Sequence, residues 1–393
     1  MTEPDRDPFP DPLPDPFPDL FIAAGGGGDP VGTAVTASAV ARAAGRGTAG
    51  AGVVAGGVPA RRHLIATYAW ERLEVDPTPG PLGAADFTGD PARAAADRSA
   101  GALVLTPATR AVPPAGSTLP RLAADLPARL LLLDPCRGLA AMAEQVRRMV
   151  DAAGARHVRL VDMGGDVLAH GDEETLCSPL VDALAVAACV LAGVDASVYV
   201  AGPGTDGEIP QEVLLERLEG AERLTPDAYD ADTAASALAW HPSEASALFA
   251  AAVYGVRGAV RTVERLIPLT DASAHVHRVD LDGALAHSAV ARRLLDVRPD
   301  TLEEAADLSA RLTGIHELER ERTGAVRRPS AAPPGPGGLP DSGARAVAAV
   351  RALAPGATHA TYRFAAGALG LGWRDIPSLR ALVGGEGPLL PLS

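Results

Sequence analysis

Three short segments of this chain combine glycine with acidic side chains, and each follows a short apolar run. They are Gly25, Gly26, Gly27, Gly28 and Asp29, then residues 162–172, and then residues 202–208. Carboxylates bind divalent cations and ligand hydroxyls, and glycines let a ligand approach the backbone closely. In open α/β sheets, ligands bind at the carboxyl ends of strands. The spacing therefore indicates a small-molecule site, but it does not identify a reaction.

The first segment has the pattern of a strand, a glycine loop and a helix. Asp29 is expected to be the N-cap, with Pro30 in the first helical position and a helix over roughly residues 31–44. The glycines permit positive φ, and free N–H groups at such a junction can hold a phosphate or carboxylate. A tight turn that packs the helix on the sheet is the alternative. The Asp29 carboxylate would compete with an anion, a conflict that a metal ion or a ribose hydroxyl would remove. The Gly-x-Gly-x-x-Gly dinucleotide fingerprint is absent, because Pro30 stands in place of its third glycine.

The second segment directly follows a predicted strand and is the richest in acids. Asp162 and Asp166 are the candidate metal ligands, with Mg²⁺ as the candidate cofactor. Asp166 and His170 are candidate catalytic residues, with His170 as a general base. A solvated acidic loop is the alternative, and Glu173 and Glu174 are expected to be solvated.

The third segment repeats this arrangement after another predicted strand. Thr205 could bond a phosphate, and Asp206 and Glu208 could bind hydroxyls or a metal. Asp206 is also a candidate for proton transfer. The glycines expected to contact a ligand in the two later segments are Gly164, Gly165 and Gly204. An acidic turn with a helix cap is the alternative.

The elements that must position these residues alternate between strand and helix. Apolar runs predict strands at residues 21–24, 63–67, 102–106, 130–134, 158–162 and 197–201. Helices are predicted at about 138–153, 180–192, 240–254 and 301–322, and in the tail at 343–353, 358–371 and 375–383. This order predicts an α/β fold with a mainly parallel, doubly wound (Rossmann-like) sheet and helices on both faces.

Composition shifts divide the chain into four predicted parts. Residues 1–18 form a proline-rich arm of a type that is disordered or lies on the surface. Residues 19–326 form the α/β ligand-binding domain, residues 327–341 a Pro/Gly linker, and residues 342–393 a short helical C-terminal segment.

The charged residues exclude several classes of function. All 35 basic residues are arginine, so neither a Walker-A lysine nor a pyridoxal-phosphate (PLP) Schiff base is possible. The net charge of −14 argues against nucleic-acid binding. There is no apolar run long enough to cross a membrane, and three sparse cysteines are typical of a cytoplasmic protein. A homodimer is expected on general grounds.

Three motifs together resemble one protein family. They are the glycine run ending at Asp29, the segment Val161-Asp162-Met163-Gly164-Gly165-Asp166 with His170-Gly171-Asp172-Glu173, and Trp240-His241-Pro242-Ser243-Glu244-Ala245. The chain resembles the prokaryotic domain-of-unknown-function family numbered 1152 over roughly residues 20–322. The resemblance implies one cytoplasmic α/β unit and assigns no activity or catalytic residue.

The motifs themselves predict an enzyme that binds a phosphorylated or polyhydroxylated small metabolite, of the nucleotide or sugar-phosphate class. The alternative is a non-catalytic protein that senses such a metabolite, or an interaction module that docks a partner through the N-terminal arm.

Overall fold

The computed structural model describes residues 19–45, 63–89, 102–327 and 338–392. Within these residues the largest sheet has eight strands, in the order β4-β6-β2-β1-β7-β8-β12-β9. They are β1 (Leu20–Ala23), β2 (His63–Thr67), β4 (Val104–Leu105), β6 (Ala128–Leu132), β7 (Val158–Met163), β8 (Ala196–Ala201), β9 (Glu222–Leu224) and β12 (Val276–Asp280). The central strands from β6 to β8 are parallel, whereas β4, β12 and β9 pair antiparallel at the edges. The predicted α/β class with a mostly parallel sheet is confirmed.

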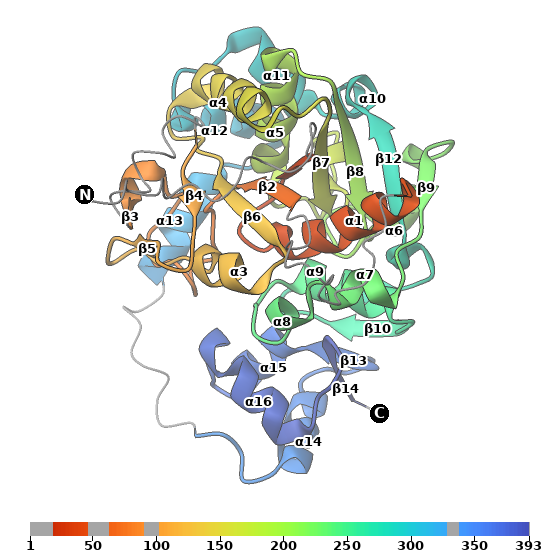
Figure 1. Cartoon of the computed structure of the whole chain (residues 1–393). Helices are drawn as coiled ribbons and strands as arrows, with labels where there is room; N and C mark the ends of the chain where they lie inside the picture. The colour runs from red at the N-terminus through yellow and green to blue at the C-terminus, as the bar shows by residue number, and fades with distance from the viewer. Residues whose placement is uncertain (1–18, 46–62, 90–101, 328–337, 393) are drawn as a thin grey trace, which may run out of the picture.

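Helices cover both faces of this sheet (Figure 1). Leu20 and Ile22 of β1 point to one face, Phe21 and Ala23 point to the other, and all four are fully buried. The first face packs against α4 (Gly138–Ala153), α5 (Pro179–Ala192), α10 (Leu281–His287), α11 (Ala289–Val297) and α12 (Leu302–Thr313). The second packs against α1 (Asp29–Ala43), α3 (Leu119–Asp125), α7 (Ala228–Asp232), α8 (Ala235–Leu238) and α9 (Glu244–Val253). Burial on both faces explains why the central strands are almost continuously apolar.

A second sheet joins two distant parts of the chain. Its order is β11-β10-β13-β14, with β10 (Gly258–Arg261), β11 (Leu266–Leu269), β13 (His359–Thr361) and β14 (Leu389–Pro391). The C-terminal part also contains α14 (Gly343–Ala352), α15 (Tyr362–Ala368), η5 (Trp373–Asp375) and α16 (Ile376–Val383). The helical C-terminal segment therefore contains two strands as well, and through β13 it is paired with β10 of the preceding region.

Smaller elements complete the described chain. A two-stranded ribbon is formed by β3 (Phe87–Thr88) and β5 (Arg110–Ala111), next to η1 (Ala84–Asp86). The helix α6 (Gln211–Arg217) contributes Leu214 to a small separate apolar cluster. Two further short 3₁₀ helices, labelled η like η1 and η5, are η3 (Asp166–Leu168) and η4 (Ala272–Ala274).

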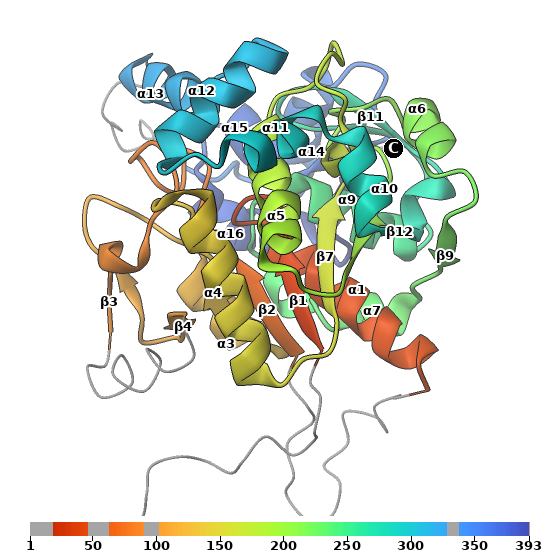
Figure 2. The ribbon, with the colours of Figure 1, turned by 90° about the horizontal axis from the view of Figure 1, so that it is seen from above.

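Three predicted elements differ from the structure. The helix predicted over residues 358–371 begins as the strand β13, and only α15 within it is helical. The single helix predicted over residues 301–322 is two helices, α12 and α13 (Glu317–Arg327), which lie next to each other (Figure 2). Gly314 ends α12 because its φ of 76° is in the left-handed region, which favours glycine. The strand predicted at residues 102–106 shortens to β4 and runs antiparallel to β6 as an edge strand.

Some expectations fall on residues that the structure does not describe, namely the arm at 1–18 and most of the linker at 327–341. No helix in the described part of the chain combines the length and apolar character needed to cross a bilayer.

Candidate functional site

The three glycine-and-acid segments meet at one end of the large sheet and line one cleft. This follows from the topology, because β1, β7 and β8 are parallel neighbours and their loops leave the same edge. The cleft encloses about 160 Å³. The predicted residues in its lining are Gly25, Gly26, Gly27, Gly28, Asp29, Asp162, Asp166, Thr205, Asp206 and Glu208. The other predicted residues, Gly164, Gly165, Gly204 and His170, are not part of this lining.

The glycine loop after β1 is closely packed against its neighbours. A Cβ atom on Gly26 would lie 2.8 Å from the Trp70 carbonyl oxygen, and one on Gly27 would lie 2.7 Å from the Glu71 carboxylate. None of the four glycines has a positive φ. The loop therefore uses glycine for close approach of neighbouring groups, and not for left-handed backbone.

Asp29 does not cap the following helix, as the sequence suggested. Gly28 is the N-cap of α1, and Asp29 is the first helical residue. The Asp29 side chain folds back over the loop, where its Oδ2 accepts a hydrogen bond of 3.0 Å from the Gly25 N–H. The Gly27 N–H donates to the Trp70 carbonyl oxygen at 2.9 Å. Two of the loop's N–H groups are thus already used, and this packing favours the tight turn over a dedicated anion site at this loop.

A group of buried carboxylates lies at the carboxyl end of β7. Alternation along β7 places Asp162 on the same face as Val158 and Leu160, the face covered by α5. Asp182, in the first turn of α5, meets Asp162 and Asp166 there. Ligand oxygens of these three aspartates lie within 4.8 Å of one another, and the side chains are 1%, 8% and 2% exposed for Asp162, Asp166 and Asp182.

The loop after β8 packs closely against the loop after β7 and is hydrogen-bonded to it. Gly164 has a φ of 122°, and a Cβ there would lie 2.2 Å from the Asp206 side chain, so only glycine fits. The Gly204 N–H donates to the Gly164 carbonyl oxygen at 2.7 Å. Gly164 and Gly204 therefore determine the shape of the two loops, and Gly164 packs directly against the Asp206 side chain.

Thr205, Asp206 and Glu208 differ in how far the protein uses their oxygens. Both Glu208 oxygens are occupied, because Oε2 accepts the Cys177 and Ser178 N–H groups at 2.7 and 2.8 Å and Oε1 accepts the Ser178 hydroxyl at 2.5 Å. Glu208 thus caps the N-terminus of α5. Asp206 Oδ1 accepts the Glu208 N–H at 3.1 Å, whereas Asp206 Oδ2 and the Thr205 hydroxyl have no partner among the described residues. These last two atoms remain available to a ligand.

Burial changes the protonation of the acids in the cleft. Loss of hydration raises the pKa of Asp162 to about 7 and is the largest cause of its shift. Burial is also the main reason that the pKa values of Asp29, Asp166, Asp182 and Asp206 lie well above the usual range, and neighbouring carboxylates raise them further. The cleft therefore holds carboxyl groups that retain protons at a higher pH than exposed ones.

Ten acidic side chains and three arginines line the cleft. The arginines do not neutralise the buried carboxylates of Asp162, Asp166 and Asp182. Arg265 donates to the Gly207 carbonyl oxygen and, at 3.2 Å, to that of Thr175. Arg363 of α15 pairs with Glu74 at 2.5 Å and Glu244 at 3.5 Å. The exposed Arg72 forms no ion pair within the described part of the chain. Arg72 is thus the cation available to an incoming anion.

Sequence reasoning missed several lining residues. Asp182 had a readable signal, since it is the single charged residue in the run Pro179–Ala192. Glu71 and Arg363 carried no signal in the sequence, because only the tertiary fold brings them to the cleft. His241 was not missed in this way, because it belongs to the third motif of the family resemblance. It lines the cleft, accepts the Ser243 N–H on Nδ1 at 3.1 Å, and its Nε2 lies 3.0 Å from Thr118 Oγ1.

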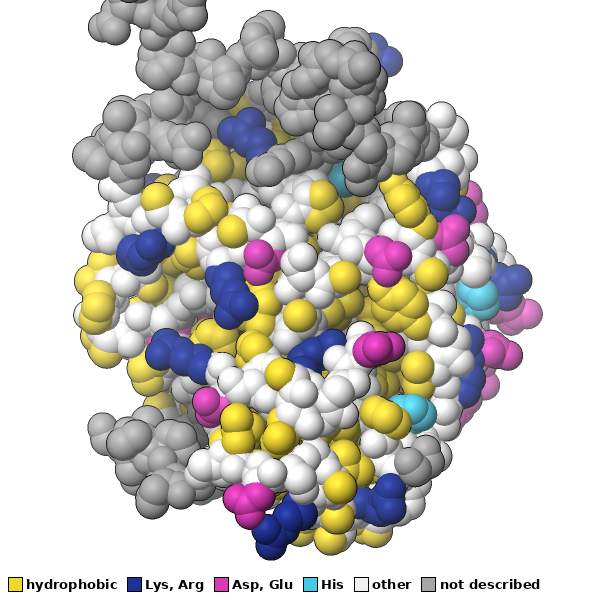
Figure 3. Space-filling view, turned by 60° about the horizontal axis from the view of Figure 1, so that its bottom comes forward, with side chains coloured by type: hydrophobic (Ala, Val, Ile, Leu, Met, Phe, Trp, Pro, Cys, Tyr) yellow, Lys and Arg dark blue, Asp and Glu magenta, His cyan; other side chains and the backbone are white. Residues whose placement is uncertain are grey.

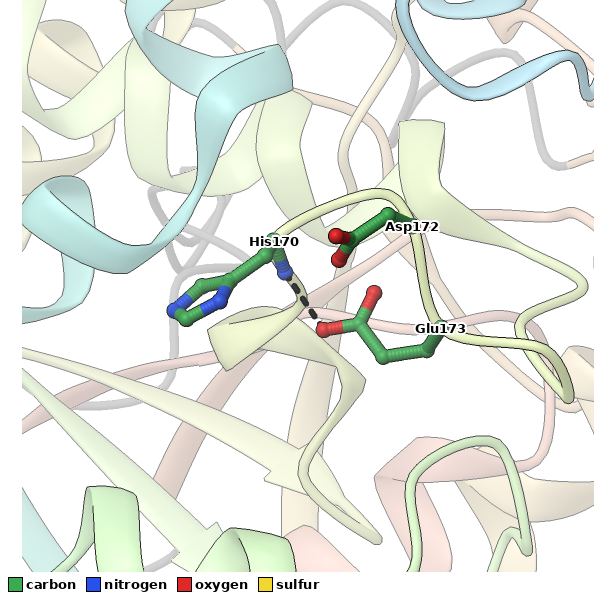
Figure 4. Close-up of side chains that lie close together, drawn as sticks. All are labelled: His170, Asp172 and Glu173. Atoms are coloured by element: carbon green, nitrogen blue, oxygen red, sulfur yellow. Dashed lines mark hydrogen bonds between the residues drawn. The ribbon is translucent and has the colours of Figure 1, made fainter.

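His170 lies away from the cleft on an exposed surface loop. Its Nε2 lies 3.0 Å from Nδ1 of His287, and the two rings stack. Figure 4 shows that the backbone N–H of His170, and not its ring, bonds the Glu173 carboxylate. Glu173 also pairs with Arg217 at 2.7 Å, so the expectation that Glu173 is solvated is wrong. The structure does not bring His170 together with the other predicted catalytic residues.

Comparisons with known proteins place the chain in a family without assigning a reaction. Searches of curated proteins and of solved structures found no match. One family model, described as "Protein of unknown function (DUF1152)", matches residues 20–325, which include β1, all three glycine-and-acid loops and α5. The C-terminal segment that carries Arg363 lies outside the match. The chain belongs to the DUF1152 family.

Proposed function

We propose that this protein is an enzyme that binds a phosphorylated or polyhydroxylated small metabolite, of the nucleotide or sugar-phosphate class, in the cleft. One observation carries the proposal: polar atoms of Asp182, Thr205 and Asp206 lie in a single cleft without partners among the described residues. Buried polar atoms are almost always hydrogen-bonded in folded proteins. Other atoms of this kind lie elsewhere in the described structure, but these three converge on one cleft, where a ligand could satisfy all of them.

The topology supports this location. We propose that the large sheet is doubly wound and Rossmann-like, because its parallel strands follow the order β6-β2-β1-β7-β8. The chain builds outward from β1 to β2 and β6, and then returns to add β7 and β8 on the other side. The crevice between the loops of β1 and β7 is therefore the switch point at which such sheets bind ligands.

The chemistry of the lining supports the ligand class. The free carboxylate oxygens of Asp182 and Asp206 can accept hydrogen bonds from ligand hydroxyls, and the Thr205 hydroxyl can donate to a phosphate oxygen. The exposed guanidinium of Arg72 suits a phosphate at the rim. A phosphate deeper inside would lie among the buried carboxylates, so it would need an accompanying cation.

Within this proposal, Asp206 transfers protons. Burial holds its pKa well above the usual range, and the Glu208 and Asp162 carboxylates add to this effect. A carboxyl group with a raised pKa can donate a proton near neutral pH and then take one back. Burial raises the pKa of Asp166 as well. His170 is not part of the cleft lining and is not kept in the proposed mechanism.

We further propose a cytoplasmic protein whose partner is a small molecule and not a nucleic acid. On the face shown in Figure 3, arginines and acids are interspersed among hydrophobic side chains and do not gather into a basic surface. The net charge of −14 opposes binding to a polyanion. The three cysteines are free, which suits a reducing compartment. A homodimer remains an expectation.

The test is a thermal-shift screen of the full-length protein against nucleotides, sugar phosphates and free sugars, with and without Mg²⁺. A ligand at one hundred times its dissociation constant should stabilise the fold by about 2.7 kcal/mol. The matched variant is Thr205→Val, which keeps the side-chain shape and removes a hydroxyl that has no protein partner. It should fold normally and bind about tenfold more weakly, since one hydrogen bond contributes about 1.5 kcal/mol.

Turnover of any ligand found in this way separates an enzyme from a sensor. Asp206→Asn should abolish turnover and retain binding, while Asp172→Asn, on the exposed surface loop, should change neither. A ligand that binds without being converted would favour the metabolite-sensing alternative. If no compound shifts unfolding, the proposal fails.

A further inference from the structure

Three aspartates in the cleft come from three different elements and point at one another. Asp162 is on β7, Asp166 begins η3, and Asp182 is on α5. Their nearest ligand oxygens lie within 4.8 Å of one another. Oxygens bound side by side on one Mg²⁺ are roughly 3 Å apart, since each lies about 2.1 Å from the metal. Small side-chain rotations would therefore bring one oxygen from each aspartate to a common cation.

The protein supplies little to balance these carboxylates. Asp162 accepts the Val167 N–H at 3.2 Å and the Gly165 N–H, and it shares a hydrogen bond with Asp166, but Asp182 Oδ1 has no partner among the described residues. Arg265 and Arg363 are committed to other groups. A buried charge without a partner costs several kcal/mol, so a cluster of this kind either keeps protons or takes up a cation.

A second observation, outside the acidic cluster, indicates a ligand. The Thr205 hydroxyl is 1% exposed, lines the same cleft and has no hydrogen-bond partner in the described structure. Proton sharing among the three aspartates supplies no partner for this hydroxyl. A hydrated cation would bring water molecules to bond it.

We propose that Asp162, Asp166 and Asp182 bind one hard divalent cation of the Mg²⁺ or Mn²⁺ class. The donor atoms are all carboxylate oxygens, the set that such ions prefer over the nitrogen and sulfur ligands typical of Zn²⁺. Asp182 is the ligand that sequence reasoning did not find. This inference deepens the proposed function, because Mg²⁺ keeps several waters that a phosphate oxygen can replace. The cation would offset the negative charge of the carboxylates, which would otherwise repel a phosphate in the cleft.

The direct test uses the metal alone. Full-length protein stripped with a chelator is titrated with MnCl₂, and bound Mn²⁺ is counted by electron paramagnetic resonance and by calorimetry. The expected result is one Mn²⁺ per chain, competed by Mg²⁺. Asp182→Asn has the same shape and should weaken Mn²⁺ binding at least tenfold. The matched control is Asp172→Asn. Asp172 belongs to a second group of possible metal ligands, His170, Asp172 and Glu173 on the surface, and this variant should bind Mn²⁺ like the wild type.

Folding of the variants is checked by circular dichroism, and Asp166→Asn provides a second test if Asp182→Asn does not fold. Absence of Mn²⁺ binding by the wild type would overturn the proposal, as would loss of binding in Asp172→Asn with retention in Asp182→Asn. The metabolite screen separates this inference from the proposed function. Mn²⁺ binding without any metabolite shift supports the cation site and rejects the function. A metabolite shift of equal size in chelator supports the function and rejects the cation site.

Discussion

Neutralising Glu317 should remove the part of the pH dependence of stability that this one buried carboxyl contributes. Glu317 lies in the first turn of α13, is 8% exposed, and accepts the Leu180 N–H at 2.5 Å at the start of α5. Burial raises the pKa of Glu317 from 4.5 to about 8, the Glu208 and Glu321 carboxylates add to the rise, and the Leu180 bond and Arg320 oppose it. In Glu317→Gln the amide oxygen can still accept the Leu180 N–H, but the side chain cannot ionise.

The sign and size of the effect follow from the two pKa values. Between about pH 4.5 and pH 8 the folded chain keeps a proton on Glu317 that the unfolded chain has lost. The free energy of unfolding therefore falls as the pH rises through this window, and it levels off above about pH 8. Each pH unit contributes about 1.4 kcal/mol, so the wild type should lose about 4 kcal/mol between about pH 5 and pH 8 through this one group.

The assay is urea unfolding in chelator at about pH 5 and pH 9. The quantity of interest is the stability of Glu317→Gln relative to the wild type, because the other titrating groups cancel in that difference. The difference should be small at the lower pH and should favour the variant by a few kcal/mol at the higher pH. Glu319→Gln, on the exposed face of the same helix, is the matched control and should show no such change. Parallel pH profiles for the wild type and Glu317→Gln would refute the reasoning, since they would mean that Glu317 ionises at an ordinary pH when folded.

Three further predictions test the walls of the cleft. Gly27→Ala should destabilise the fold by about 1–3 kcal/mol in urea unfolding, because the new Cβ would lie 2.7 Å from the Glu71 carboxylate, and unchanged stability would contradict the packing described for this loop. His241 should remain neutral from about pH 5 to pH 9, because burial lowers its pKa to about 3, and a ring signal that titrates near neutrality by NMR would refute this. Arg363→Met should lower the free energy of unfolding by about 3 kcal/mol, because it leaves Glu244 buried without its cation. A protease should then cleave the C-terminal segment faster. A variant as stable as the wild type would show that the pair contributes nothing to stability.

The sequence predicted which loops meet in the candidate site, because strand positions and loop composition can be read locally. Glycines and acids after β1, β7 and β8 were readable, and parallel neighbouring strands bring their loops to one edge. Distance along the chain was a poor guide within a loop, however. Asp166 and His170 are only a few residues apart, but η3 turns the chain so that Asp166 is buried and His170 is exposed. Asp182 entered the site from a helix whose buried face depends on tertiary packing.

The acids of the cleft divide into two kinds according to whether the protein already uses their oxygens. Glu208 accepts the Cys177 and Ser178 N–H groups directly before α5, and Glu71 accepts the Thr118 N–H at 2.6 Å directly before α3. Glu317, which is outside the cleft lining, accepts the Leu180 N–H in the same way. Carboxylates at these positions stabilise helix N-termini and explain much of the acidity without any ligand. Asp182 and Asp206 cap no helix and retain free oxygens. Because all of these acids lie close together, counting charge alone would have assigned every one of them to a ligand. The hydrogen bonds instead limit the candidate ligand-binding side chains to the few whose oxygens the fold leaves unpaired.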